Sequence, residues 1–508
     1  MPRTIGIRHR VKQTAKGEAR PTQVCIVEGE KVTLLDLGDE QAELDFASGI
    51  FPTAHRNVEE REDLTKVKRH HIKWRKLTSV DQAHGLPDSH VRQDGRTYYR
   101  AHQIPSTYDG LKAHDRVAMV LGGSGDSLAY ALTRRGKSID ASVYRIPPSK
   151  LSIARGEGNK DDDADLLARL LEETPEFFYS SDNRDLALIT VRELYRARMD
   201  AMKARIACEQ RLRQLVIGET FRSDIYPEGD VEHAFDLRKA NDIVLQNLER
   251  EEAARDRQLA KALEGLDIYQ QLFKQVEGLG PSAAARILSA IVDYRQFIVG
   301  PDEAEMQRLY EESERLEKEG NFEADIGRIE DKLTKGDKKF RTLQLVRSYK
   351  RRIGKGSEAA LLDQAIACHK TRAQMRHKAR QKTAAKLKAF CGVHVLEDGR
   401  FARKRSGQVA NWNPDARQGL YLLADQWSIY RPNSPWGVYL NQMKANLRQK
   451  HPAVETVEGK KRYTDGHIFK MARWRTLTRF VEQMAYAFCD FDKGKSVQGI
   501  RPPKSQVD

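Results

Sequence analysis

Arg116–Ile146, RVAMVLGGSGDSLAYALTRRGKSIDASVYRI, is the stretch that decides the fold of the N-terminal part of the chain. The run RVAMVL is apolar and ends at glycines, which predicts a buried strand, and Ser138–Ile146 predicts a second strand. Between them, Asp126–Arg135 predicts a helix that follows the glycine-rich turn at 122–125. Strand, helix and strand in this order predict an α/β domain over roughly residues 20–180.

Upstream of this stretch, two short apolar runs predict a β-hairpin. They are Val24–Val27 and Lys31–Leu37, separated by Glu28-Gly29-Glu30. Residues 1–20 are basic and predict a flexible arm, whereas residues 52–110 are polar and irregular.

Downstream, the chain becomes rich in amphipathic helical patterns. Residues 184–275 carry apolar side chains at three- and four-residue spacing, which predicts a helical hairpin or coiled coil. A second charged helical segment covers about 302–337, and 357–490 is mainly helical with a β-like patch at Cys391–Phe401. The last residues, 491–508, form a tail.

The charge of the chain points to a polyanionic partner. Its 508 residues include 88 Lys and Arg against 73 Asp and Glu, a net charge of +15. Such a surplus favours nucleic acid, because each neutralised phosphate releases condensed counterions, although a merely basic soluble protein is the alternative. Thirteen cations lie between Arg347 and Lys388, opposed only by Glu358 and Asp363. The cations are therefore concentrated in one segment.

The cysteines and the apolar runs exclude several classes of protein. The five cysteines are scattered without a CxxC pair, so they suggest neither a zinc site nor a disulfide framework and favour a reducing compartment. No secretory signal is recognisable at the N-terminus, and no apolar run has the length of a membrane span. We expect a soluble, cytoplasmic protein.

The clearest motif is VEGLGPSAAARILSAIVDYRQF at Val276–Phe297. Gly278 and Gly280 permit a tight turn, and Pro281 suits the first turn of the following helix. This pattern predicts a helix-hairpin-helix whose backbone N–H groups meet phosphate without reading the sequence. An ordinary turn between two helices is the alternative.

A second motif is KDDDADLL at Lys160–Leu167. Asp162 and Asp165 are three residues apart on a predicted helix and therefore project from one face. Paired carboxylates of this kind can hold Mg²⁺ for phosphodiester cleavage. Acidic residues that open a helix are also favoured simply by the helix dipole.

A third motif places a serine beside three cations. Ser406 follows Arg403, Lys404 and Arg405, and beside a scissile phosphate it would suit a nucleophile. A surface loop is the alternative. Further along, aromatic and basic residues alternate around Trp436–Arg448 and Lys470–Arg479, which fits either nucleic-acid contacts or helix packing.

Taken together, these motifs resemble those of the bridge-RNA-guided insertion-sequence transposases, the IS-one-ten family related to the Piv invertase. The resemblance rests on EGLGPSAAARILSAIVDYRQF at Glu277–Phe297 and on Lys160, Asp162 and Asp165 in a Lys-x-Asp-x-x-Asp pattern. LKAFCG at Leu387–Gly392 and the set Asn413, Arg417 and Leu420 follow in the family's order. The similarity covers about residues 110–490.

The resemblance implies an α/β RuvC-like (RNase H-like) domain at 21–183, coiled-coil helices at 184–275 and a mainly α C-terminal domain at 276–490. Within the last, the helix-hairpin-helix occupies 276–297 and a helical insertion 301–360. It further implies a transposase or site-specific recombinase of the bacterial nucleoid, working as a dimer or tetramer on DNA with a structured guide RNA.

The implied site residues fall into two groups. Asp162 and Asp165 would bind Mg²⁺, and Ser406 would be the nucleophile. The nucleic-acid contacts would come from the glycine hairpin and the basic C-terminal motifs: Gly278, Gly280, Arg286, Arg403, Lys404, Arg405, Asn413 and Arg417.

The sequence departs from the family at two of its four acidic positions. Taking Val24–Glu28 as strand one puts Val27 where the family has its first aspartate, and Gly122 replaces the family's glutamate. The alternative function is therefore a catalytically inactive descendant that still binds nucleic acid. A structural coiled-coil scaffold is a third class, which would leave the basic C-terminal half unexplained.

Overall fold

A computed structural model gives the architecture. It describes residues 3–11, 19–59, 62–78, 86–225, 229–320, 357–396, 401–403, 412–455 and 461–503. The chain divides into two compact units, Met1–Thr190 and Val191–Asp508. None of the helices in the described ranges is both long enough and apolar enough to cross a bilayer.

The first unit is built on a six-stranded mixed sheet. Its strand order is β10-β9-β8-β1-β2-β3. Strand β2 runs antiparallel to both of its neighbours, β1 and β3, whereas β8 runs parallel to β1 and β9 parallel to β8. The strands are β1 (Thr4–Arg8), β2 (Thr22–Glu28), β3 (Lys31–Leu37), β8 (Arg116–Val120), β9 (Ser142–Ile146) and β10 (Tyr179–Ser180).

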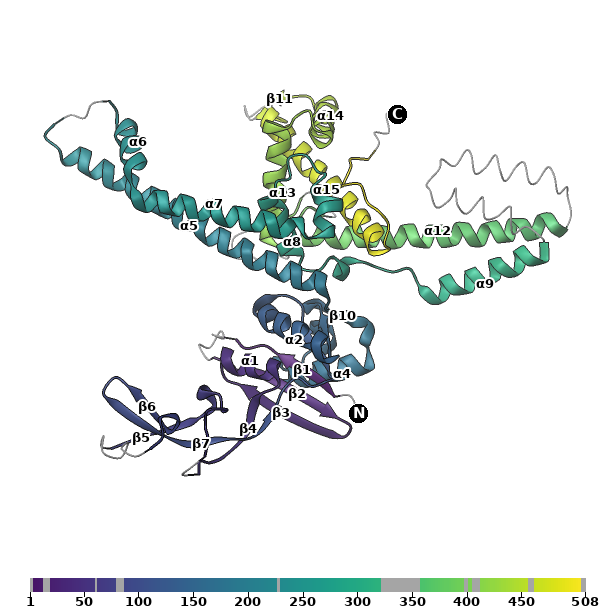
Figure 1. Cartoon of the computed structure of the whole chain (residues 1–508). Coiled ribbons are helices and arrows are strands. Elements are labelled where there is room, and N and C mark those ends of the chain that lie inside the picture. Colours follow the sequence, from purple (N-terminus) through teal and green to yellow (C-terminus); the bar gives the residue numbers. More distant parts are fainter. Residues whose placement is uncertain are drawn as a thin grey trace. The chain divides into compact units, whose positions relative to one another are not determined.

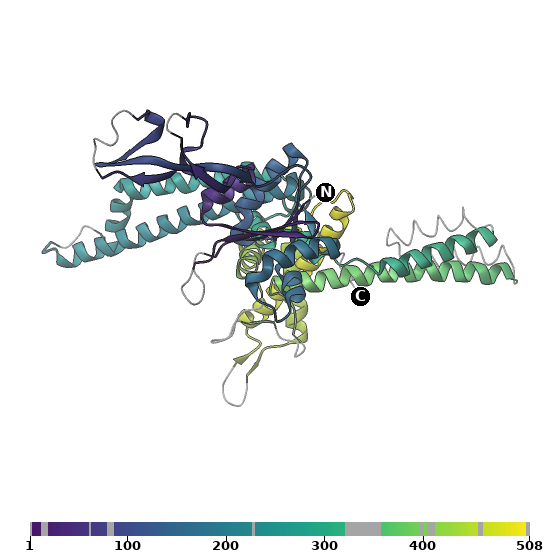
Figure 2. The ribbon, with the colours of Figure 1, turned by 90° about the horizontal axis from the view of Figure 1, so that it is seen from below.

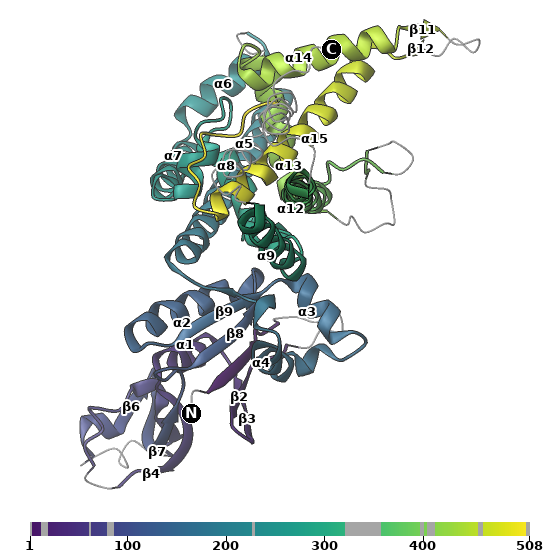
Figure 3. The same cartoon turned by 90° about the vertical axis from the view of Figure 1, so that its right-hand side faces the viewer.

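Helices cover both faces of this sheet (Figure 3). One face packs α1 (Glu40–Ser48) and α2 (Asp126–Ile139) over side chains such as Ile5, Ile7 and Val117. The other face packs α3 (Pro148–Arg155) and α4 (Asp163–Glu173), with Leu167 and Leu171 in its core. The alternation of side chains along each strand produces these two cores. The predicted α/β domain is confirmed at this level.

The prediction of a flexible basic arm at 1–20 is wrong for Thr4–Arg8. This segment, TIGIR, forms β1, lies between β2 and β8, and is almost wholly buried. It is a five-residue strand flanked by cations, so its apolar pattern is too short to stand out from a basic context. Strand one of the sheet is therefore β1 and not the segment Val24–Glu28.

A second, smaller sheet is inserted between α1 and β8. It consists of β4 (Phe51–Asn57), β5 (Lys73–Lys76), β6 (Val91–Asp94) and β7 (Thr97–Asp109), with the short 3-10 helices Arg69–His71 (η1) and Asp88–His90 (η3). The long strand β7 pairs with each of the others. Most of its side chains are exposed or half-buried, which explains why residues 52–110 look irregular in the sequence.

The second unit begins with the expected helical hairpin. Helices α5 (Asn183–Arg222) and α7 (Ile243–Glu264) run side by side, joined through α6 (Val231–Asn241), as Figures 1 and 2 show. Arg198 pairs with Asp256 at 2.9 Å and Arg205 with Glu252 at 2.5 Å across the hairpin. A small apolar cluster at the far end includes Leu212, Phe235 and Leu245.

The rest of this unit is helical around an aromatic core. The stacked rings of Trp427 and Trp436 lie 5.5 Å apart, and Phe480 packs edge-on against both. The helices are α8 (Pro281–Ile291), α9 (Glu303–Gly320), α12 (Ser357–Phe390), α13 (Pro414–Asp425), α14 (Pro435–Lys450) and α15 (Asp465–Asp492), with π-helical turns at Tyr269–Phe273 and Gln426–Tyr430 and a two-stranded ribbon, β11 (Val454–Glu455) and β12 (Lys461–Arg462). Helix α9 lies along α12 (Figure 2). In the predicted β-like patch, the described residues show one antiparallel bridge, between Val395 and Phe401.

Candidate functional site

Three side chains, Ser124, His9 and Glu43, lie in contact where β1 and β8 end. The Oγ of Ser124, in the glycine-rich turn before α2, lies 2.9 Å from Nδ1 of His9. The other ring nitrogen of His9, Nε2, lies 3.4 Å from Oε1 of Glu43 in α1. Because β1 and β8 are parallel and adjacent, their carboxyl ends bring His9 and Ser124 together.

The carboxylate of Glu43 is buried and ionised. Burial alone raises the pKa of Glu43, but hydrogen bonds from His9 and Thr22 outweigh it and hold the pKa below its ordinary value. Arg10 adds a positive charge, with its Nε 3.5 Å from Glu43. An ionised Glu43 favours the proton on Nε2 of His9, which leaves Nδ1 as the acceptor for the Ser124 hydroxyl.

The turn that carries Ser124 depends on glycine. Gly122 and Gly123 both have positive φ, +82° and +83°, and a Cβ on Gly125 would lie 3.2 Å from Cβ and 3.3 Å from Cγ of His9. Ser124 is exposed at this turn, directly before the N-terminus of α2. A serine bonded to a histidine beside backbone N–H groups is the arrangement that nucleophilic catalysis uses.

The predicted metal ligands Asp162 and Asp165 lie at the N-terminus of α4, the helix that packs on β1 and β2. Asp162 is exposed. Asp165 is half-buried, 2.9 Å from Arg169 and 3.8 Å from the sulfur of Cys25. The acid between them in sequence, Asp163, is buried and bound by Arg155 at 2.6 and 2.8 Å.

No third acidic group joins this pair among the residues that the structure describes. The one described set of three metal-capable side chains is Asp45, His70 and His71, elsewhere in the unit. Strand β1 ends at Arg8 and continues into His9 and Arg10, so cations occupy the end of the true first strand. The expectation of a missing aspartate was based on Val24–Glu28, which is not the first strand. Strand β1, which is the first strand, also has no acidic residue at its carboxyl end.

The predicted helix-hairpin-helix residues have mixed surroundings. Gly278 has φ +87°, and a Cβ there would meet Gln426 at 3.2 Å and Trp427 at 3.4 Å, so packing as well as the turn requires glycine. Gly280 is exposed with open space around it and caps α8. Arg286 pairs with Asp415 of α13 at 3.1 Å and is mostly covered. The exposed N-terminus of α8 is thus the part of this motif open to phosphate.

The C-terminal motif residues that the structure describes are mostly engaged in packing. The guanidinium of Arg417 lies 4.6 Å from the rings of both Trp412 and Trp474 and donates to the carbonyl of Ala402 at 2.8 Å. Asn413 caps α13 by accepting from the N–H of Ala416. Arg403 is exposed. Lys404, Arg405 and Ser406 lie outside the described residues.

One aromatic residue of the alternating pattern at Trp436–Arg448, Trp436 itself, belongs to the core. Trp436 is buried, stacks on Trp427 and donates its indole N–H to the carbonyl of Ile500 at 2.8 Å. Between the two alternatives for the alternating pattern, helix packing therefore accounts for Trp436.

The exposed cations of α12 form a regular row. Lys378, Lys382 and Lys386 are all exposed and are four residues apart. Within the described ranges, no hydrogen bond or ion pair involves their ammonium groups. Neighbouring positions on α12, among them Thr383 and Leu387, are buried and belong to the face of the helix that packs in the core of this unit. Four helical residues span about 6 Å, so the row is an even line of unpaired positive charge.

Sequence reasoning missed His9, Glu43 and the histidine pair near Asp45. His9 was assigned to a flexible arm, and Glu43 and Asp45 lie in a helix that shows no motif. The dipeptide His70-His71 lies in the basic segment KVKRHHIKWRK at Lys66–Lys76, and nothing in that segment distinguishes the two histidines from the surrounding basic residues. Only the fold brings these residues together, since α1, β1 and the insertion are separate in sequence.

Comparison with known proteins adds no assignment. The chain matches no protein-family model and no curated protein.

Proposed function

We propose that this chain is a nucleic-acid-binding protein with a RuvC-like N-terminal domain that has lost metal-dependent strand cleavage. The observation that carries the proposal is the row Lys378, Lys382 and Lys386 on α12, exposed and without partners among the described residues. Evenly spaced, unpaired ammonium groups suit a phosphate backbone, whose neutralisation releases counterions. DNA is the expected partner, and a structured guide RNA, assembly into an oligomer and a place at the nucleoid follow from the family resemblance.

The sheet of the first unit supports the RuvC-like part of the proposal. A meander of three antiparallel strands, β1 to β3, continues through the parallel strands β8 and β9, which is the arrangement of RNase H-like domains. Helix α4, which carries Asp162 and Asp165, packs against β1 as the last acidic segment of such a domain would.

The acidic residues around this sheet support the loss of cleavage. Hard cations such as Mg²⁺ need several oxygen ligands, and two-metal cleavage needs them close together. At the end of β1 stand Arg8 and Arg10, at the end of β8 stands Gly122, and Asp165 is paired with Arg169. The positive charges of Arg10 beside Glu43 and of Arg169 beside Asp165 disfavour a Mg²⁺ ion at these carboxylates.

A charge-matched pair of triple variants tests the binding surface. Lys378→Gln, Lys382→Gln and Lys386→Gln together should reduce the slope of log affinity against log salt by about 2–3 and weaken duplex binding at least about tenfold. The control replaces Lys203, Arg250 and Lys261, exposed cations of the α5–α7 hairpin, with glutamine. Equal loss in both variants, or no loss in the first, would contradict the assignment to α12.

A second candidate function is strand transfer with Ser124 as the nucleophile. The chain Ser124–His9–Glu43 favours it, because it supplies a base and an orienting carboxylate without any metal. Ser124 Oγ would attack the phosphorus while its proton passes to Nδ1 of His9. The bond from phosphorus to the leaving strand then breaks, and the departing oxygen takes that proton.

The trapping of a covalent protein–DNA adduct separates the two functions. Strand transfer predicts that a nicked substrate becomes attached to the parent protein and to a Ser127→Ala control, but not to Ser124→Ala. The binding protein predicts no adduct with any of the three, with affinity unchanged.

A further inference from the structure

The side chains of Asp45, His70 and His71 converge on one point in the first unit. Nε2 of His71 lies 2.7 Å from Oδ2 of Asp45, and Nε2 of His70 lies 3.1 Å from the same oxygen. One atom of each residue lies within 4.8 Å of the other two. Asp45 comes from α1, and the two histidines come from η1 in the inserted sheet, so the cluster joins two elements.

The cluster is sheltered but remains open on one side. The side chains of Asp45 and His71 are only 6% and 3% exposed, whereas that of His70 is 41% exposed. Nδ1 of His71 is buried and has no hydrogen-bond partner among the described residues, so this ring makes its polar contact through Nε2. The exposed side chain of His70 is therefore the side from which solvent reaches the cluster.

A neighbouring amide orients the carboxylate. Nε2 of Gln41 donates to Oδ1 of Asp45 at 3.1 Å. A carboxylate with a fixed orientation and two imidazoles is a ligand set common in metal sites.

We propose that Asp45, His70 and His71 bind a zinc ion, with water as the fourth ligand. Zinc bound at about 2.0–2.1 Å places its nitrogen and oxygen ligands about 3.3 Å apart in a tetrahedron. The distances from Nε2 of His70 to the two carboxylate oxygens, 3.1 and 3.2 Å, are close to this value, whereas the 2.7 Å distance from Nε2 of His71 would lengthen by about 0.6 Å. Imidazole ligands favour zinc and its transition-metal neighbours over Mg²⁺ or Ca²⁺.

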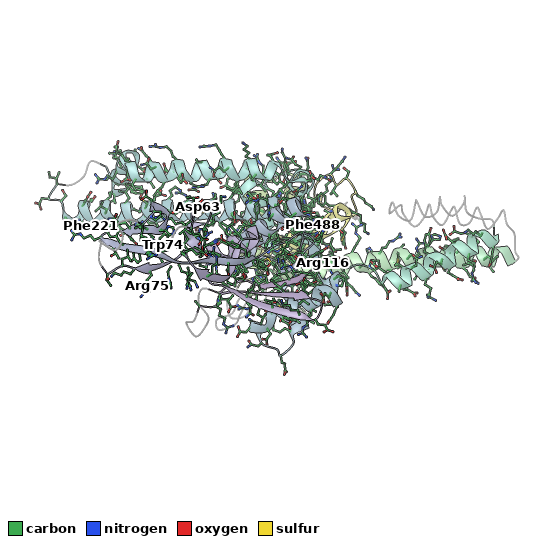
Figure 4. All side chains as sticks on the ribbon, turned by 60° about the horizontal axis from the view of Figure 1, so that its bottom comes forward. Asp63, Trp74, Arg75, Arg116, Phe221 and Phe488 are labelled. Carbon is green, nitrogen blue, oxygen red and sulfur yellow. The ribbon has the colours of Figure 1, made fainter. Side chains whose placement is uncertain are left out.

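The ion would fasten the inserted sheet to α1. The apolar core of the insertion is small, with Leu64, Ile72, Ala101 and Ile104 as its buried members. Ile72 directly follows His71, and Trp74, labelled in Figure 4, donates to the carbonyl of Arg69 in the same short helix at 3.4 Å. Small folds with little apolar core commonly gain stability from a bound metal.

Metal binding by the purified, tag-free full chain tests the proposal. After removal of metals with a chelator, we expect one equivalent of Zn²⁺ to bind and to raise the melting temperature, with Mg²⁺ inactive. Co²⁺ should give the visible absorption of a four-coordinate site. Hydrogen exchange in η1 and in β4–β7 should slow when Zn²⁺ is added.

Three variants make the test specific. His70→Ala should fold, because His70 is the most exposed ligand, and it should weaken zinc binding by about 100-fold or more. Gln41→Ala removes only the amide that orients Asp45, so it should weaken zinc binding less, by about 10–100-fold. His114→Ala is the matched control, since His114 pairs with Asp140 on the surface at 3.1 Å. It should bind zinc as the parent does.

The opposite results would overturn the site. A cluster held by hydrogen bonds alone predicts no stoichiometric zinc binding and no zinc-dependent change in melting temperature or exchange. Binding that survives the double change of His70 and His71 to alanine would place the zinc elsewhere. Neither outcome depends on nucleic-acid binding.

Discussion

Arg417 shows how a residue that fits a nucleic-acid motif can instead serve the core. Its guanidinium lies between Trp412 and Trp474, and burial lowers its pKa from the ordinary value. Planar guanidinium stacking on aromatic rings is a contact that lysine reproduces poorly. We therefore assign Arg417 to the packing of α13 and α15.

This assignment predicts the effect of Arg417→Lys. The variant should lose about 1–3 kcal/mol of unfolding free energy because it loses the double stack and the bond to Ala402. Its nucleic-acid affinity should equal that of the parent. Denaturant unfolding and duplex binding, measured on the same preparation, check both parts; weaker binding with unchanged stability would return Arg417 to the interface.

Arg3 anchors the start of β1 through two carboxylates. It lies 2.9 Å from Asp109 and 2.7 Å from Asp115. Burial raises the pKa of Asp109, but hydrogen bonds from Arg3 and Lys112 outweigh it, so the folded pKa lies below the ordinary value near 3.9. The ionised form is therefore favoured by folding.

Asp109→Asn should lower stability at neutral pH, and the difference from the parent should be constant above about pH 5. As the pH falls through the depressed folded pKa of Asp109, the parent loses this contribution and the difference should shrink. Hydrogen exchange of β1 and β8 peptides at several pH values reports it. Asp94→Asn, at an exposed position, is the control and should change the unfolding free energy little. A difference between parent and Asp109→Asn that grows in acid would contradict a depressed folded pKa of Asp109.

Among the elements, α4 packs directly on the backbone of β1 at Gly6. A Cβ at Gly6 would lie 1.9 Å from the carbonyl oxygen of Ala164 and 2.6 Å from the nitrogen of Ala168. Both are backbone atoms of α4 and cannot move aside independently. Glycine is thus required at the middle of a strand, where it is otherwise disfavoured.

Gly6→Ala should destabilise the first unit by about 3 kcal/mol or more, because the helix must shift off the sheet. Gly38→Ala is the control, since open space surrounds Gly38. Hydrogen exchange of β1, β2 and α4 peptides distinguishes the two. Equal protection in both variants would mean that α4 does not pack on β1 as described.

The sequence predicted those elements whose pattern is long or bounded by strong signals. The parallel pair β8 and β9, the hairpin of β2 and β3, and the helices α2, α4, α5 and α7 all follow from periodicity and glycine. Strand β1 was missed because five residues in a basic segment carry too little pattern. The inserted sheet was missed because both of its faces are largely exposed.

The candidate site was less accessible to sequence reasoning than the fold. The sequence showed that the segment Arg347–Lys388 is basic and that 357–490 is mainly helical. These two observations together are enough to place Lys378, Lys382 and Lys386, which are four residues apart, in a row along α12. The contacts of His9 with Ser124 join residues 115 positions apart, so they follow only from the pairing of β1 with β8. The zinc ligands likewise come together only when the insertion meets α1.

At the scale of the whole molecule, the two parts of the proposed function rest on different units. The loss of strand cleavage rests on the first unit, and nucleic-acid binding rests on the second. The first has the mixed sheet, with Arg8 and Arg10 at the end of β1, and the second has the basic helix α12 and the glycine hairpin at Gly278–Gly280. A net charge of +15 on 508 residues makes electrostatic binding the property that both halves share.

The salt dependence of duplex affinity for the full chain tests the central claim most directly. We predict that log affinity falls linearly with log salt, with a slope of about −3 or steeper, because at least three phosphates are neutralised. Absence of binding at low salt, or a slope near zero, would contradict a nucleic-acid-binding function.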